Sequence, residues 1–205
     1  MAERSSIVVR PARRGDAGAV AALVYQTSPV LHDRFAGDRR RALGLLEAAF
    51  ERAGTNASAE IVRVAELEAE LAAAMACFCA REARRRNDAL LRLALSRSLP
   101  WRWPSLLRFF RRGRRTTPSP PADSLYIDAL ASDPLYRRRG VARALLAAAE
   151  EEARRLGLAA LSLETVDTNS AARSLYESAG FSARSESLPA GDFPGFVLYV
   201  KEPLK

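Results

Sequence analysis

The segment that decides the fold reads ALASDPLYRRRGVA at residues 129–142, and an alanine- and leucine-rich helical pattern continues to residue 157. The segment opens as the end of a strand, and Asp133-Pro134 ends it. Three arginines and Gly140 then lead directly into the helix. A helix N-terminus exposes unpaired N–H groups and a partial positive charge, so this order predicts an anion site. Gly140 suits it because a residue without Cβ lets the backbone approach an oxygen closely.

The loop does not match the common nucleotide-binding motifs. The chain contains neither the G-x-x-x-x-G-K-[ST] loop nor the G-x-G-x-x-G fingerprint. Residues 137–142 instead fit the pattern Arg/Gln-x-x-Gly-x-Gly/Ala. A second motif, N-x-x-A-x-x-L-Y-x-x-x-G-F, follows at residues 169–181.

The remaining periodicity predicts a mixed order of strands and helices. Strands are expected at 6–12, twice within 60–80, and at 123–134, 158–166, 181–187 and 195–202. Helices are expected after an Asp16 N-cap and at 38–54, 140–157 and 167–181. The stretch SPVLHDRF (28–35), which holds the only histidine, His32, is expected to be a loop. This order predicts an α/β fold whose sheet of about seven strands has helices on both faces.

Composition indicates one globular domain over residues 1–205, with an insertion at about 81–121. The net charge of +8 is concentrated there, because residues 81–118 hold twelve arginines and two acidic residues, which leaves the rest of the chain near −2. Residues 80–110 have an amphipathic helical pattern that includes both tryptophans, and residues 111–121 have the composition of a linker. Three interpretations stay open: a hairpin covering the sheet, a lid favouring an anionic acceptor, or a surface for nucleic acid or anionic lipid.

The longest apolar run, residues 71–80, is about half of a membrane span, and the first ten residues contain no apolar signal core. We therefore expect a cytoplasmic protein. The two cysteines, Cys77 and Cys79, are too few for a metal cluster, and no metal is expected.

With both motifs in register, the chain resembles the GNAT superfamily of acyl-CoA-dependent N-acyltransferases and looks like its bacterial members. The likeness is nearly continuous over residues 125–181, and residues 6–80 and 195–202 match the element order. It implies a GNAT-like mixed, mostly antiparallel sheet and transfer of an acetyl group from acetyl-CoA to a primary amine by direct attack. The alternative is a catalytically inactive acyl-CoA-binding regulatory or interaction protein. Glu68-Ala69 stands where the family often has Asp-Gly in the turn between its second and third strands.

The resemblance also implies which residues contact acetyl-CoA. The backbone of Leu130 and Ser132, in the fourth strand, would pair with the pantetheine amides. The N–H groups of residues 137–143 would bind the pyrophosphate, and arginine side chains could add contacts to phosphate. Asn169 is expected either to cap the next helix or to touch the cofactor. The implied cofactor-binding residues are Leu130, Ala131, Ser132, Arg137, Arg138, Arg139, Gly140, Val141, Ala142, Arg143 and Asn169.

In relatives that use it, the tyrosine at the position of Tyr176 protonates the departing CoA thiolate. A carboxylate acting through water would remove the proton of the amine; Asp128 is the first candidate and Glu164 the second. The expected acceptor is a small-molecule or peptide amine. Binding of nucleic acid or an anionic membrane surface is the further partner considered, and the oligomeric state is left open, a homodimer included.

Overall fold

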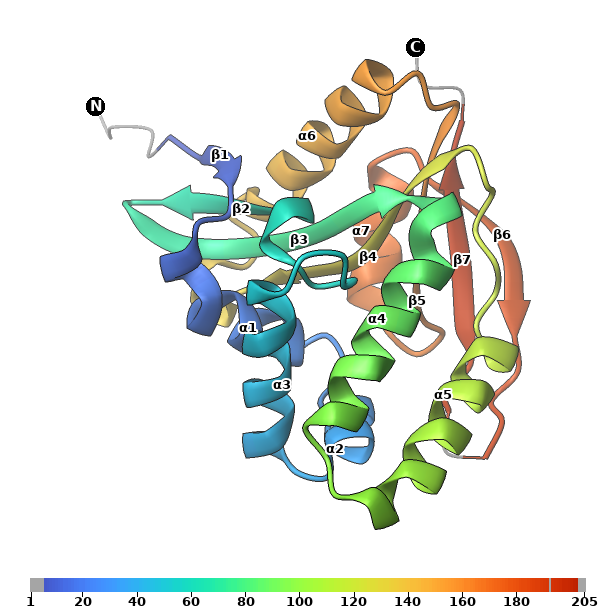
Figure 1. Ribbon diagram of the computed structural model, residues 1–205. Coiled ribbons are helices and arrows are strands. Elements are labelled where there is room, and N and C mark those ends of the chain that lie inside the picture. Colours follow the sequence, from blue (N-terminus) through green and yellow to red (C-terminus); the bar gives the residue numbers. More distant parts are fainter. Residues whose placement is uncertain (1–5, 192, 203–205) are drawn as a thin grey trace. The chain divides into compact units, whose positions relative to one another are not determined.

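The computed structural model describes residues 6–191 and 193–202 and contains a seven-stranded sheet of order β1-β2-β3-β4-β5-β7-β6 (Figure 1). Four neighbouring pairs are antiparallel (β1–β2, β2–β3, β5–β7 and β6–β7), and β4 and β5 are parallel. The predicted mixed, mostly antiparallel sheet is therefore confirmed. The strands are Val8–Pro11 (β1), Val62–Leu67 (β2), Glu70–Cys79 (β3), Ser124–Ser132 (β4), Ala160–Val166 (β5), Ser182–Ser187 (β6) and Phe196–Lys201 (β7).

The α-helices differ from the predicted ones in two places. They are Ala17–Tyr25 (α1), Pro29–Ala36 (α2), Arg39–Glu51 (α3), Ala83–Ser96 (α4), Trp103–Thr116 (α5), Val141–Arg155 (α6) and Ser170–Ser178 (α7). Where a loop was expected at 28–35 there is a helix, because Pro29 occupies the first helical turn, a position that proline favours. Among the described residues, no helix is long and apolar enough to cross a membrane.

The prediction of a linker at 111–121 is also wrong over the first half of that segment. Residues 111–116 belong to α5, since arginine is a good helix former and the single Gly113 costs only about 1 kcal/mol. Gly113 lies against the Phe193 ring, which leaves little room for a larger side chain. Helix α5 ends at Thr116, and Thr117, which precedes Pro118, is extended, as a residue before proline prefers.

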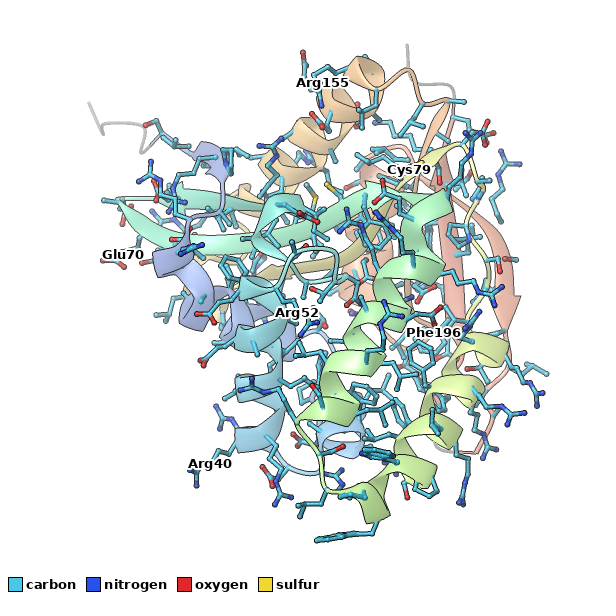
Figure 2. The ribbon with its side chains drawn as sticks, in the orientation of Figure 1. Arg40, Arg52, Glu70, Cys79, Arg155 and Phe196 are labelled. Atoms are coloured by element: carbon cyan, nitrogen blue, oxygen red, sulfur yellow. The ribbon has the colours of Figure 1, made fainter. Side chains whose placement is uncertain are left out.

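The described residues form two compact units, one within residues 1–77 and 129–149 and the other within residues 78–128 and 150–205. In the first unit, α1 and α2 pack against α3. Asp38 caps α3 by accepting a hydrogen bond from Arg41 N at 2.8 Å, as expected. Asp16 precedes α1 as expected, but its side chain binds Arg13 N and the Arg10 guanidinium instead of capping α1. Figure 2 shows Arg40 of α3 projecting away from the ribbon.

The β2–β3 hairpin turns at Glu68 and Ala69, the two residues that stand where the resemblance led us to expect Asp-Gly. Leu67 pairs with Glu70, so the turn consists of Glu68 and Ala69, with φ angles of 57° and 65°. Two-residue hairpins prefer such primed turns because their twist matches that of the strands, but only glycine and, less readily, asparagine or aspartate adopt them at low cost. The hairpin therefore forms as predicted and carries local backbone strain at both positions.

The second unit is built on β5 and β7, whose residues are almost entirely buried. Ala160, Leu198 and Val200 form one apolar cluster there. Helices α4 and α5 contact each other, and the Phe109 ring of α5 lies 4.7 Å from the Phe193 ring. The predicted insertion is thus a pair of helices.

Candidate functional site

The glycine loop of the first unit connects β4 to α6. A short 3-10 helix at Pro134–Tyr136 begins where Asp133 accepts a hydrogen bond from Leu135 N at 2.9 Å. Arg138 and Gly140 then turn the chain with φ angles of 60° and 88°.

The loop leaves backbone donors at the start of α6. The first helical hydrogen bond of α6 runs from Ala144 N to Gly140 O at 3.0 Å. The N–H groups of Val141 and Ala142 precede it and have no acceptor within the helix, which is the geometry of an anion-binding helix N-terminus.

Arg139 contributes to this loop through its backbone, because its side chain is engaged elsewhere. The Arg139 guanidinium forms an ion pair with Glu68 of the β2–β3 turn and lies 5.7 Å from the centre of the Tyr136 ring. A Cβ added at Gly140 would approach Ile7 at an ordinary 3.5 Å. Glycine is therefore required at 140 for its left-handed φ and not for space.

The residues expected to face the pantetheine lie at the carboxyl end of β4. Leu130 and Ser132 are half-buried, whereas Ala129 and Ala131 are on the other face of the strand and are buried. Asp133 N donates to Ala72 O of β3 at 2.9 Å and holds this end of the strand. The structure thus brings Leu130 to Ser132 and Arg137 to Arg143 into one continuous strand–loop–helix segment.

In the second unit, two carboxylates and a phenol gather at the end of the β4–β5 ladder. The parallel register runs from Ser124 opposite Ala160 to Ile127 opposite Leu163. Because side chains alternate along a strand, Tyr126 and Asp128 share one face of β4, and Glu164 lies on the corresponding face of β5. The structure therefore brings together both candidate bases.

Burial raises the pKa of Glu164 to about 8, and the negative charge of Asp128 contributes further. A hydrogen bond from Tyr126 acts in the opposite direction and lowers this pKa. The Oε2 atom of Glu164 is buried and has no hydrogen-bond partner among the described residues, although the side chain as a whole is partly exposed. Burial also raises the pKa of Tyr126 well above its ordinary value. Glu164 is therefore a carboxyl that exchanges a proton near neutral pH.

Tyr176 is a buried residue of α7. Its ring lies 6.0 Å from the Phe181 ring and 5.9 Å from the Tyr199 ring, and burial raises its pKa to about 12. Within the described part of the chain, its hydroxyl forms no hydrogen bond. The phenol thus keeps its proton at neutral pH and has no competing partner for donation.

Hydrogen bonds fix α7 against β7. Tyr199 OH donates to Glu177 Oε1 at 2.8 Å and accepts from Arg173 Nε at 3.1 Å. Asn169 Oδ1 accepts from Ala172 N at 3.2 Å, so of the two expected roles of Asn169 the structure contains the helix cap. This docking holds the Tyr176 side chain in place.

His32 of α2 stacks on Tyr25 at 5.9 Å, and burial lowers its pKa. The Tyr25 hydroxyl donates to Asp33 at 3.0 Å. Among residues 6–191 and 193–202, no group of three His, Cys, Asp or Glu side chains is placed to hold a metal ion.

Comparison with known proteins agrees with the two motifs. The family model "Acetyltransferase (GNAT) family" matches residues 105–181, which include the glycine loop, Glu164 and Tyr176. No curated protein matches this sequence.

Solved structures share the fold. An N-acetyltransferase from Staphylococcus aureus Mu50 has a TM-score of 0.72 at 22% identity, covering 94% of this chain and 99% of that chain. The ribosomal-protein-S18-alanine N-acetyltransferase from Escherichia coli has a TM-score of 0.55 at 17% identity, covering 97% and 94%. The acetyltransferase yncA from Salmonella typhimurium, solved with its cofactor acetyl-CoA, has a TM-score of 0.52 at 17% identity, covering 96% and 93%.

The family match carries the assignment, and the shared fold agrees with it along nearly the whole chain. The residues matched also contain the glycine loop, Glu164 and Tyr176. Residues 105–181 therefore match the GNAT acetyltransferase family, and the chain shares its fold with solved acetyltransferases.

Proposed function

We propose that this protein is an N-acetyltransferase that moves an acetyl group from acetyl-CoA to a primary amine by direct attack. The observation that carries the proposal is the turn at Gly140, with φ of +88°, directly before α6 in a segment matched by the acetyltransferase family. It leaves two backbone donors, Val141 N and Ala142 N, free of the helix, as a pyrophosphate requires.

The residues present fit acetyl-CoA as a cosubstrate. The N–H groups at the start of α6 would bind the pyrophosphate, and the half-buried end of β4 at Leu130 and Ser132 offers backbone groups for the pantetheine amides. The side chain of Arg139 is held by Glu68, which supports recognition by the backbone more than by this guanidinium. Asn169 supports the site as a helix cap.

Acetyl-CoA supplies a thioester whose carbonyl carbon is open to attack by a neutral amine. A bond forms between the amine nitrogen and that carbon, and the carbon–sulfur bond breaks. We propose that Glu164, directly or through water, takes the proton that the amine loses, because its raised pKa suits proton transfer near neutral pH. The Tyr176 hydroxyl would give its proton to the CoA sulfur and regain one from solvent. Asp128 then acts on Glu164 through its charge.

Release of free CoA thiol from acetyl-CoA tests the proposal, measured against a panel of small amines, amino acids and peptide N-termini. We expect turnover with at least one acceptor class and binding of acetyl-CoA without any acceptor. Binding with no turnover on the whole panel would favour the inactive acyl-CoA-binding alternative. Failure to bind acetyl-CoA, CoA or a longer acyl-CoA would overturn both.

A further inference from the structure

A group of exposed apolar side chains surrounds the turn between α4 and α5. The exposed fractions of Leu99, Trp101, Trp103 and Leu107 are 51%, 73%, 44% and 42%. These four residues lie within nine positions of the sequence. Trp103 Nε1 donates to Leu95 O at 3.1 Å, and this hydrogen bond holds the Trp103 ring of α5 against the end of α4. We name these four residues the apolar tip.

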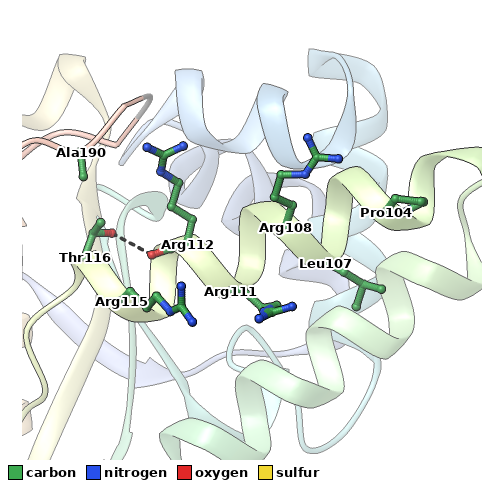
Figure 3. A pocket seen from close by; sticks show the side chains of 8 residues that line it. All are labelled: Pro104, Leu107, Arg108, Arg111, Arg112, Arg115, Thr116 and Ala190. Carbon is green, nitrogen blue, oxygen red and sulfur yellow. Dashed lines mark hydrogen bonds between the residues drawn. The ribbon is translucent and has the colours of Figure 1, made fainter.

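A cationic groove continues from the apolar tip along α5 (Figure 3). It has a volume of about 770 Å³, and four arginines line it together with Pro104, Leu107, Thr116 and Ala190. The arginines, at 108, 111, 112 and 115, are spaced by three and four residues and therefore follow one side of the helix. We name these four residues the arginine groove.

Three of the four arginines of the groove meet no carboxylate among the described residues. Within residues 6–191 and 193–202, no carboxylate forms an ion pair with Arg108, Arg111 or Arg115, whereas the neighbouring Arg114 pairs with Asp88 at 3.4 Å. Since unpaired like charges on one helix face repel each other, an anion bound in the groove would stabilise this arrangement.

The opposite side of α5 packs against the rest of the second unit. Leu106 is buried, and Phe109 and Gly113 lie against the Phe193 ring. Helix α5 is thus amphipathic, with its apolar side packed on the protein and its arginine groove turned outward beside the apolar tip.

We propose that the α4–α5 pair docks the protein on the surface of a bilayer that contains anionic phospholipid. Tryptophan prefers the membrane interface, where its amphipathic ring lies at the level of the headgroups. The arginine groove would bind lipid phosphates, and Leu99 and Leu107 would enter the apolar layer. Nucleic acid would use the same charges, but it offers no apolar layer for two exposed leucines. The proposal is independent of the acyl-transfer reaction.

Because both tryptophans of the chain lie in the apolar tip, intrinsic fluorescence reports on this surface directly. The experiment adds phosphatidylcholine vesicles with and without 30% phosphatidylglycerol to the full chain. We expect a blue shift and quenching by brominated acyl chains only with the anionic vesicles. Binding without quenching would show adsorption by charge alone and would overturn insertion of the tip.

Charge and insertion are separated by two variants. Arg108→Gln/Arg111→Gln/Arg115→Gln removes three unpaired arginines, and Leu99→Ser/Leu107→Ser removes apolar area while keeping both fluorescent reporters. Arg112 is kept because its guanidinium lies against Gly191. An arginine near an anionic surface changes partitioning by roughly five-fold, so the triple variant should bind about 100-fold more weakly at low salt.

The matched control is Arg14→Gln/Arg40→Gln/Arg52→Gln, which removes three exposed arginines from the other unit. This control should bind like wild type or within a few-fold of it. Equal losses in the two triple variants, or unchanged binding of the groove variant, would overturn the proposal. So would retention of full binding by the leucine variant, or a shift of RNA mobility without any response to vesicles. Circular dichroism and acetyl-CoA binding establish that each variant is folded.

Discussion

Glu164→Gln is the most informative single change. It replaces a carboxyl whose ionised form is destabilised by burial with a neutral side chain of nearly the same shape. Below its unfolded pKa of 4.5 the carboxyl is protonated in both the folded and the unfolded chain. As the pH rises from 4.5 to about 8, the unfolded chain ionises while the folded chain holds its proton. The stability that depends on the protonated carboxyl is therefore lost progressively over this window and is fully lost above pH 8.

Each pKa unit corresponds to about 1.36 kcal/mol, so roughly three units between pH 5 and pH 8 set an upper value of about 4 kcal/mol. Solvent reaches part of the side chain, and we expect about 2–4 kcal/mol. The free energy of unfolding of Glu164→Gln relative to wild type should thus rise between pH 5 and pH 9 and level off.

Urea unfolding at pH 5, 6, 7, 8 and 9 measures this difference, since the other titrating groups are common to both proteins. Asp128→Asn is the matched variant, because it removes the second cause of the raised Glu164 pKa. In this variant, the pH at which the unfolding free energy has lost half of the Glu164 contribution should be lower than in wild type. A difference that stays constant across the pH range would refute the raised pKa of Glu164. The turnover rate of the wild type should rise with pH up to about 8, and this rise should be absent from the pH–rate profile of Glu164→Gln.

Three further changes test the remaining parts of the site and fold. Tyr176→Phe keeps the ring contacts and removes the proton donor, so turnover should fall by about 10²-fold or more while calorimetric acetyl-CoA affinity stays nearly intact; unchanged turnover would exclude Tyr176 from the mechanism. Gly140→Ala places a Cβ on a residue with a φ of +88° and should weaken acetyl-CoA binding by about ten-fold. Arg139→Gln keeps the backbone N–H and should leave this binding unchanged; a larger loss in Arg139→Gln than in Gly140→Ala would assign recognition to the Arg139 side chain. Ala69→Gly relieves a φ of 65° and should stabilise the chain by about 0.5–1 kcal/mol in urea unfolding, and a loss of stability would contradict the strained turn.

Much of the fold was predictable because its signals are local. Period-two and helical patterns gave the strands and most helices, and Asp38, Gly140 and Asn169 mark helix starts through residue chemistry alone. The errors at α2 and at the end of α5 arose where a proline or a charged run resembles a loop. Pro29 begins a helix, and the arginines of 111–115 continue one, because the apolar side of α5 packs on Phe193.

The sequence by itself determined the strand–loop–helix segment, since the start of any helix leaves N–H groups unpaired and glycine readily adopts the positive φ of the turn before it. The tertiary structure alone decided the ranking of the two carboxyl groups. Both are carboxylates in the sequence, but the raised pKa of Glu164 depends on its burial and on the charge of Asp128, which come together only when β4 and β5 pair. The tertiary structure also decided which arginines are available to bind an external anion. Glu68 forms an ion pair with Arg139, whereas three arginines of α5 meet no carboxylate in the described chain.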